Sequence, residues 1–452
     1  MWKAFINIFK IDSLRSRVLF TLLILIVFRI GTAIPVPGID YSVLANYYEN
    51  FGRGNLGVLE FFNLFAGGAL RNFSIFALGV MPYISSLIII QLLIYVIPSL
   101  ERISKEPDGR RKIMQYARIG TIPMAIIEAM GLSLYYLKAL KAEAAAYTGL
   151  SLFPDTFWFY LNFIITVTTG TMFLVWMGEQ ITEKGIGNGV SLIIMGGIVA
   201  RIPDSLYRVY QQMRNSGQME LTIALVIILF LAVIVFVVWF EQSIRKVPVN
   251  YAKRIVGRKV YGGQNTYIPL KLNPAGVVAI IFASAVMSFP QQVLTFFGGS
   301  NSQVVKTLVA WFSFEGWLYI TLYMLLVIFF SYFYTFIQFN PQDLAETLQK
   351  NGGFIPGIRP GENTHRFLND TLNKILVPGS IIIGIIAVAP NLLYSALKIP
   401  TYIAYLLGGT SLLIMVGVAL DTLTQIESQL IMHHYDGFLK KGKIRGRGTR
   451  YV

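Results

Sequence analysis

Long apolar runs, separated by short polar stretches, recur along the whole chain. Most of the runs are about as long as the roughly 20 helical residues that cross a bilayer, and they carry few or no charges. They cover residues 18–37, 73–97, 119–137, 156–178, 185–200, 221–240, 274–296, 316–337, 375–397 and 402–420. The pattern predicts an all-α polytopic membrane protein with ten transmembrane helices.

The stretch 55–91 departs from a simple succession of spans. Its first apolar run, 58–66, is far too short to cross a bilayer. A Gly-Gly pair and then Arg71-Asn72 interrupt the pattern before the next long run begins. A segment that enters the membrane without crossing it is tolerated only inside protein or along a cavity. We therefore expect a short re-entrant helix, and a cavity that the rest of the chain builds around it.

The distribution of basic residues supports ten spans. The chain has 38 Lys and Arg against 23 Asp and Glu, a net charge of +15. When polar stretches are assigned to alternate sides of the membrane, 28 basic residues fall on one side and 9 on the other, and Arg29 lies within the first span. Basic residues concentrate on the cytoplasmic side, so we expect both termini there. The basic N-terminal segment is interpreted as leading into a first transmembrane helix, since no convincing cleavage site follows it.

Two glycine-rich apolar segments, far apart in the chain, share a motif. GVSLIIMGGIV (189–199) and GTSLLIMVGVA (409–419) are identical at six of eleven positions. A weaker match joins IFALGVM (75–81) to IFASAVM (281–287). The fifth span thus corresponds to the tenth, and the second to the seventh. Because five spans separate the copies, they cross the membrane in opposite directions, which is typical of an inverted repeat.

An inverted repeat divides the chain into two five-helix halves. We expect an N-terminal half over 1–220, a C-terminal half over 221–430 and a basic cytoplasmic tail over 431–452. Residues that correspond near a pseudo-two-fold axis in the membrane plane lie at similar depth. We therefore expect Ile194 and Ile414 to face each other near the midplane, where branched aliphatic side chains can close a passage by excluding water.

Two cytoplasmic loops are longer than the topology requires. In 241–273, alternating apolar residues predict a β-hairpin, and in 338–374 a short polar helix precedes a turn rich in glycine and proline. A few charges suffice to orient a membrane protein, so an ordered basic hairpin favours a docking surface for an acidic protein or a phosphate-rich partner. The candidate docking residues are Lys253, Arg254, Arg258, Lys259 and Arg359.

The sequence offers little reaction chemistry. The chain has no cysteine and no His-Glu metal motif. Glycine-rich stretches at 52–57 and 185–189 resemble a dinucleotide fingerprint, but no strand precedes them and no βαβ unit surrounds them, so nucleotide binding is disfavoured. Arg29 and Glu128 are the clear ionisable residues deep in spans, whereas ion-coupled transporters normally use several buried carboxylates. A secondary transporter with a broken-helix site stays open as the alternative to a passive channel.

Small residues mark the second and seventh spans. Ser85-Ser86 in one span and Ala283-Ser284-Ala285 in the other would allow close packing of two helices. Such a contact contains little interlocking surface, so it can separate easily. Generic small-residue packing explains these residues equally well.

Several long motifs, in order and in spacing, resemble the SecY family, the main subunit of the bacterial protein-export channel. They are FRIGTAIPVPGID (28–40), FNLFAGGALRNFSIFALGVMPYISSLIIIQLL (62–93), GTMFLVWMGEQITEKGIGNGVSLII (170–194), VNYAKRIVGRKVY (249–261), FIPGIRPGE (354–362) and GGTSLLI (408–414). The resemblance covers essentially the whole chain. It implies two inverted five-helix halves around a central hourglass pore, with no enzymatic active site, no cofactor and no metal.

The resemblance also implies roles for particular residues. A re-entrant plug helix would occupy 56–70, a hydrophobic ring would close the pore, and spans 2 and 7 would form a lateral gate. The plug residues would be Leu56, Leu59, Phe61, Phe62, Leu64, Phe65, Gly67 and Gly68. The ring would comprise Val80, Ile84, Val190, Ile194, Ile281 and Ile414, and the gate Ser85, Ser86, Gln91, Ser284 and Ser288.

The implied function is a passive protein-conducting channel in the plasma (inner) membrane. It would pass unfolded secretory polypeptides with signal sequences across the membrane and release membrane segments sideways into the lipid bilayer. The implied partners are SecE- and SecG-like small membrane subunits, the SecA motor ATPase and the ribosome, whose rRNA would contact the basic loops. The motor or the ribosome, docked on those loops, would supply the energy.

Overall fold

The computed structural model describes most of the chain. The described residues are 11–44, 63, 65–138, 140–142, 145, 151–216, 219–251, 254–256, 259–261, 265–297, 303, 307, 311, 316–397 and 409–441. At several helix ends and at the tip of the cytoplasmic hairpin, only the backbone is described.

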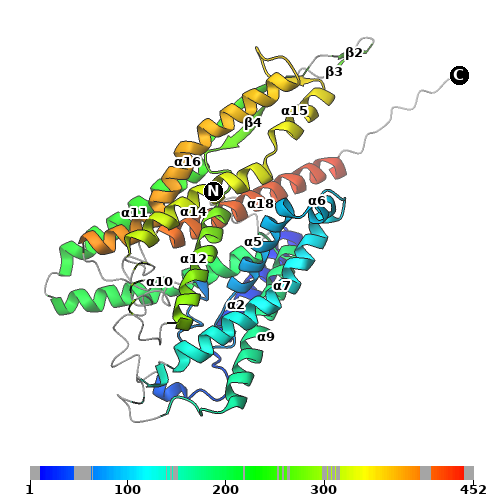
Figure 1. Ribbon diagram of the computed structural model, residues 1–452. Coiled ribbons are helices and arrows are strands. Elements are labelled where there is room, and N and C mark those ends of the chain that lie inside the picture. Colours follow the sequence, from blue (N-terminus) through cyan, green and yellow to red (C-terminus); the bar gives the residue numbers. More distant parts are fainter. Residues whose placement is uncertain are drawn as a thin grey trace.

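Ten helices match the ten predicted spans (Figure 1). They are α2 (Asp12–Ala33), α5 (Met81–Val96), α7 (Gly109–Gly131), α9 (Phe157–Lys184), α10 (Gly189–Ser216), α11 (Met219–Gln242), α12 (Val278–Phe297), α14 (Trp317–Gln338), α16 (Glu362–Leu397) and α18 (Gly409–Lys441). A short π-helix, η1 (Leu132–Leu137), continues α7. Among the described residues, seven helices are long and apolar enough to cross a membrane, and α5 joins them when it is counted with α6 (Pro98–Ser104), from which it bends by 107°.

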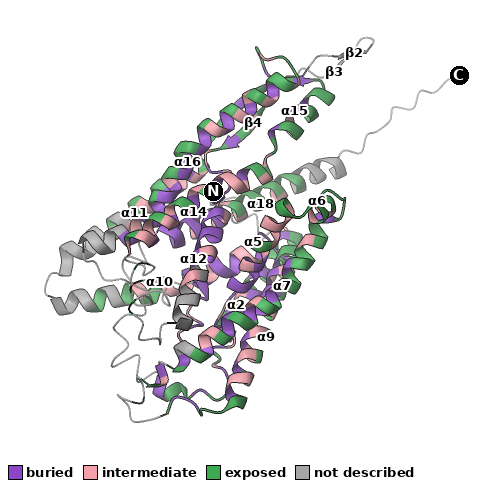
Figure 2. Cartoon of the chain, viewed as in Figure 1, coloured by how far each residue is buried: buried purple, intermediate pink, exposed green. Residues whose placement is uncertain are grey.

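The outer faces of the helices are apolar. Leu23 on α2, Ile119 on α7 and Val235 on α11 each expose more than half of their surface. Figure 2 shows exposed positions along the outer helix faces and buried positions where helices meet. Soluble proteins rarely expose so many large apolar side chains, whereas lipid surroundings favour them. The chain is a multi-pass membrane protein.

The structure corrects two predicted helix boundaries. The second span begins at Met81 and not at residue 73, because the preceding segment bonds to the end of α2 and Phe73 has a φ of +44°. The fifth span does not stop at Arg201, since α10 continues through Pro203. Proline removes one helix hydrogen bond, but flanking turns can carry the helix past it.

The helices pack as two matching series of neighbours. In the first half α5 contacts α7, α7 contacts α9, and α9 contacts α10; in the second half α12, α14, α16 and α18 repeat this order. In addition, α2 packs against α9 and α10, and α11 packs against α18. The halves meet where α5 contacts α12 and where α10 contacts α18. This is the arrangement that an inverted repeat predicts.

Glycines that correspond in the repeat make corresponding contacts. A Cβ atom placed on Gly189 would lie 1.8 Å from the carbonyl oxygen of Gly178 on α9, and one placed on Gly409 would lie 1.5 Å from that of Ile386 on α16. Any side chain at either position would therefore force two helices apart. The repeated motif exists because both halves need the same close helix approach.

The two long loops, 241–273 and 338–374, which the sequence predicts to be cytoplasmic, form one body at the upper end of Figure 1, here called the cytoplasmic body. β1 (Ile244–Tyr251) pairs antiparallel with β4 (Asn265–Lys271), and β2 (Arg254–Val256) pairs with β3 (Lys259–Tyr261), which confirms the predicted hairpin. The second loop contributes the predicted short helix, α15 (Pro341–Lys350), and β5 (Gly353–Phe354). Because β5 pairs with the free edge of β1, the loops share a sheet of order β4-β1-β5.

This cytoplasmic body has a hydrophobic core of its own. The core consists of Val247, Val249, Leu270, Leu348, Ile355, Leu368 and Ile375. These residues come from the hairpin, from α15 and the turn after it, and from the start of α16. Where α16 passes the foot of the hairpin, a Cβ on Gly379 would lie 2.3 Å from the carbonyl oxygen of Leu272. Both loops therefore pack directly against α16.

Candidate pore, plug and lateral gate

The six predicted ring residues come from four helices that meet between the halves. They are Val80 and Ile84 at the start of α5, Val190 and Ile194 on α10, Ile281 on α12, and Ile414 on α18. All six belong to one apolar cluster, in which five are buried and Val190 is partly exposed. The structure thus brings these side chains into one region, and their role as a ring stays a prediction.

The predicted plug lies only partly within the described residues. Phe65 is buried, with 1% of its surface exposed, and Gly67 and Gly68 follow it in a turn. The other predicted plug residues, Leu56, Leu59, Phe61, Phe62 and Leu64, lie outside the described residues.

Near the end of the predicted plug the chain makes a helix-terminating turn, here called the exit turn (residues 65–68). The N–H of Gly68 donates to the carbonyl of Asn63 at 2.9 Å, and Gly67 has a φ of +64°. This combination is a Schellman motif, and its left-handed position favours glycine. Asn63 is buried; its Oδ1 accepts the N–H of Arg71 at 3.0 Å, and its Nδ2 has no partner among the described residues.

The exit turn and the segment after it are attached to α2. Arg29 donates from Nη1 to the carbonyl oxygen of Gly67 at 2.8 Å. Farther along, Ser74 pairs with Pro35 as an isolated antiparallel bridge. The predicted span residue Arg29 therefore contacts the backbone at the base of the plug. Glu128, the other predicted ionisable span residue, is buried on α7.

Ser86 and Ser284, on the two predicted gate helices, each hydrogen-bond to a neighbouring group. Ser86 donates to the carbonyl oxygen of Ala117 on α7 at 2.7 Å. Ser284 donates to Ile280 within α12 at 2.8 Å and lies 3.1 Å from the hydroxyl of Tyr323 on α14. Both hydroxyls thus bond within their own half, and the role of these serines in a lateral gate stays a prediction. Hydroxyls in an apolar region are costly without a partner, so each takes the nearest one.

The remaining gate residues differ in what the structure describes. Ser85 is half-buried, and Gln91 has an Oε1 with no hydrogen-bond partner among the described residues. The side chain of Ser288 lies outside the described residues. Nevertheless α5 and α12, the helices of the second and seventh spans, are in contact.

One contact that the sequence did not reveal joins the halves near the C-terminal end of α5. Tyr95 on α5 and Phe333 on α14 pack edge to face, with ring centroids 5.3 Å apart. Beyond α5, a 2.7 Å hydrogen bond from Lys105 to Glu101 raises the pKa of Lys105, and the negative charge of Asp343 on α15 adds to the rise. The aromatic pair is therefore the direct contact between the halves that these residues provide.

The predicted docking residues lie on the cytoplasmic body. Arg359 is exposed in the turn before α16, where the hydroxyl of Thr364 donates to its carbonyl at 3.0 Å. Arg254 and Lys259 lie on the paired strands β2 and β3. Lys253 and Arg258 lie outside the described residues.

In the glycine-rich turn before α10 (185–189), the N–H groups with described partners are not available to bind an anion. Its N–H groups donate to protein oxygens: Ile186 to Thr21 Oγ1, Gly187 to Gln425 Oε1, and Gly189 to Thr182 Oγ1. The first two of these bonds tie the turn to α2 and α18. The turn is therefore a structural junction, as expected from the missing βαβ unit. The other glycine pattern, 52–57, lies outside the described residues.

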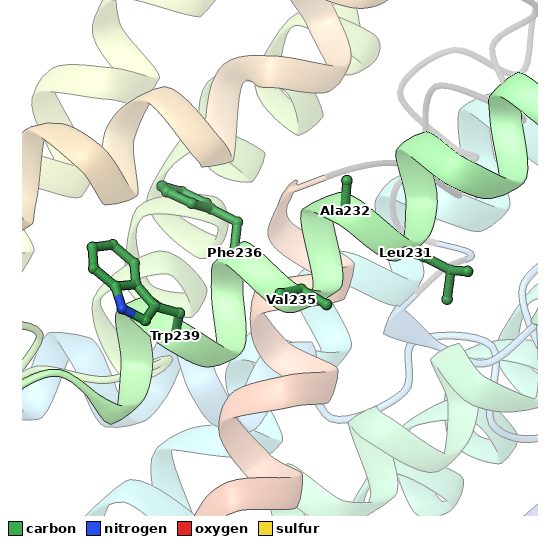
Figure 3. A pocket seen from close by; sticks show the side chains of 5 residues that line it. All are labelled: Leu231, Ala232, Val235, Phe236 and Trp239. Atoms are coloured by element: carbon green, nitrogen blue, oxygen red, sulfur yellow. The ribbon is translucent and has the colours of Figure 1, made fainter.

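An apolar hollow of about 520 Å³ lies along α11 (Figure 3). It is lined by Leu231, Ala232, Val235, Phe236 and Trp239. These side chains belong to a single helix, and none carries a charge. A hollow of this kind suits lipid, since the indole N–H of Trp239 is the single polar group among these side chains.

Comparison with known sequences identifies close relatives over the full length. A family profile described as SecY matches residues 74–423. The Protein translocase subunit SecY of Escherichia coli (strain K12) is 44% identical over 440 residues, covering 97% of this chain and 96% of that protein. The subunit of the same name from Thermotoga maritima is 41% identical over 450 residues, covering 99% and 100%.

Comparison with solved structures identifies the same fold. A structure described as a protein conducting channel matches with a TM-score of 0.64 at 18% identity, covering 92% of this chain and 93% of that one. Sec61, in a canine ribosome-channel complex from the endoplasmic reticulum, matches with a TM-score of 0.61, 18% identity and the same coverage. A structure concerned with the plug domain of the SecY protein matches with a TM-score of 0.62.

Proposed function

Since this chain belongs to the SecY family of protein translocase subunits, we propose that it forms the passage for unfolded secretory polypeptides across the plasma membrane, with both termini in the cytoplasm. The observation that carries the proposal is the meeting of four helices from two inverted halves around one cluster of branched aliphatic residues. Six of these residues, defined above as the ring, close the resting pore by excluding water. The plug at 56–70 covers the closed point from outside.

The lateral exit lies between the halves, where α5 contacts α12 and Tyr95 contacts Phe333. A hydrophobic signal sequence or membrane segment reaches lipid by separating these helices. The chain acts as a passive channel, which its membership of a family of protein translocase subunits supports.

The cytoplasmic body receives the partner that supplies energy. The relatives found by structure include Sec61 and Ssh1 channels in complexes with ribosomes, which supports a ribosome as one partner. A SecA-like motor ATPase is the second, and SecE- and SecG-like small subunits complete the membrane complex. The exposed, basic turn at Arg359 and the basic hairpin tip suit acidic protein surfaces and phosphates.

The function is tested by reconstituting the purified complex in vesicles with the motor and ATP. We expect a polypeptide with a signal sequence to become protected from added protease, and a version without the signal to stay accessible. Accumulation of small solutes by the same vesicles, with no protection of the polypeptide, would favour the alternative, a secondary transporter.

Charge reversal on the cytoplasmic body is expected to weaken docking. Arg359→Glu, or Arg258→Glu with Lys259→Glu, places negative charge where an acidic or phosphate-bearing partner binds, so motor affinity should fall several-fold and more steeply at low salt. Motor binding to vesicles measures the change. Arg15→Glu, at the exposed start of α2, is the matched control. Unchanged affinity in both body variants would contradict the docking assignment.

A further inference from the structure

We propose that Arg29 and Gly197 form a latch that holds the exit turn, and thereby keeps the plug seated in the resting channel. Arg29 is the positioning residue that bonds the turn, and Gly197 supplies the surface against which the turn lies. This inference rests on the proposed function, because it takes 56–70 to be the plug.

The bond from Arg29 is placed where a cation is most effective. The exit turn ends a helical segment, and the carbonyl groups at such an end carry partial negative charge. The guanidinium of Arg29 donates to the carbonyl of Gly67, the residue just past this helix end, at 2.8 Å. A hydrogen bond from a charged donor in a partly buried, membrane-level site is stronger than the same bond in water.

The seat on α10 leaves no space for the turn to shift inward. A Cβ on Gly197 would lie 2.9 Å from the Cα of Gly67, and a Cβ on Gly67 would lie 2.8 Å from the Cα of Gly197. On the α2 side, the ring of Phe28 lies 3.2 Å from the position that a Cβ on Gly67 would occupy. The turn is therefore clamped between α2 and α10, with the Arg29 bond as its polar fastening.

The second half of the chain shows that the fold itself does not require this arginine. The residue that corresponds to Gly197 is Gly417, and its Cβ position lies 2.2 Å from the side chain of Val277. That contact is apolar, and α11, which occupies the place of α2 in this half, has no Arg or Lys. An arginine within a span is costly. It occurs in the half that carries the predicted plug, where it bonds to the carbonyl of Gly67. In the other half, an apolar side chain packs at the corresponding glycine.

The chain's lack of cysteine allows the latch to be tested with one reporter thiol. Ala66 is 1% exposed in the exit turn, so Ala66→Cys is a small change whose thiol should react slowly with a membrane-impermeant maleimide added from outside. In the assembled complex, Arg29→Gln should raise the labelling rate about tenfold or more, since a bond to a charged group is lost. Resting ion conductance in planar bilayers should rise in parallel.

A second variant tests the seat independently. Gly197→Ala adds a Cβ that collides with the exit turn but favours the helix, so it should raise the same labelling rate without loss of folded complex. Arg15→Gln removes one arginine from the exposed end of the same helix and is the matched control for charge. Labelling at the wild-type rate in Arg29→Gln would overturn the role of Arg29, and the same result in Gly197→Ala would overturn the seat.

The test separates the latch from the plug assignment. Deletion of 56–66 removes most of the predicted plug and should raise conductance on its own. If the deletion leaves conductance unchanged, the proposed plug is wrong, whereas a leaking deletion with wild-type labelling in both latch variants refutes the latch alone. Should Arg29→Gln reduce the yield of complex, the labelling rate of Gly197→Ala decides.

Discussion

Replacing Ile414 with asparagine is expected to make the resting channel conduct ions. Ile414 is fully buried on α18, in the apolar cluster where the halves meet. Burying an isoleucine contributes about 1.5–3 kcal/mol, and each 1.4 kcal/mol is a tenfold change in an equilibrium, so a polar replacement should raise the wetted population of the constriction at least about tenfold. Single-channel recordings in planar bilayers would measure it.

The same substitution has a second expected consequence. If less free energy is needed to wet and open the ring, polypeptides with defective signal sequences should pass more readily. Ile194→Asn should behave alike, since the repeat places Ile194 and Ile414 at corresponding positions. The control is Ile119→Asn on the outer face of α7, where 65% of the side chain is exposed. Wild-type conductance in both ring variants would mean that these residues only pack, and the constriction would have to be sought on other helices.

Tying α5 to α14 is expected to abolish export. Tyr95 and Phe333 contact each other between the halves, so Tyr95→Cys with Phe333→Cys can be joined by a short, cleavable bismaleimide. No native cysteine competes. A joined pair prevents the helices from separating, so protection of a signal-bearing polypeptide in vesicles should fall to background, and cleavage of the reagent should restore it.

A link within one half controls for the chemistry of this experiment. Arg118 on α7 and Glu179 on α9 form an ion pair inside the N-terminal half. A reagent that joins cysteines at these two positions should leave export intact, because α7 and α9 need not separate. Export that continues through a fully joined Tyr95–Phe333 pair would place the exit elsewhere.

The positions of the helices and the division into two halves were predictable from hydrophobicity, charge and the internal repeat. Apolar runs and the distribution of basic residues located ten helices, and the six identities between 189–199 and 409–419 located the repeat. The start of α5 was not predictable, because residues 73–80 are nearly as apolar as the helix that follows them. Their hydrogen bonds to the end of α2, together with the positive φ angles of Phe73 and Gly79, keep them out of the helix.

The candidate site was predictable in its residue types and less so in its contacts. A serine in a span indicates close packing, but not which neighbour its hydroxyl reaches, so the bond from Ser86 to Ala117 could not be foreseen. The contact between Tyr95 and Phe333 joins residues 238 positions apart, and no local pattern encodes it. Likewise, Arg29 was recognisable as an unusual span residue, but its acceptor is a backbone carbonyl, which carries no sequence signature.

The close approach of Gly379 to Leu272 divides α16 into two parts, one on each side of this contact. The helix has 36 residues, a rod of about 54 Å, and Gly379 lies near its middle. The part before Gly379 packs in the core of the cytoplasmic body. The part after it includes Ile386, whose carbonyl lies against Gly409 of α18. We therefore expect a force on the turn at Arg359 to tilt α16 about Gly379. The part of α16 beyond Gly379 would then move in the opposite sense and displace α18, the helix that bears Ile414.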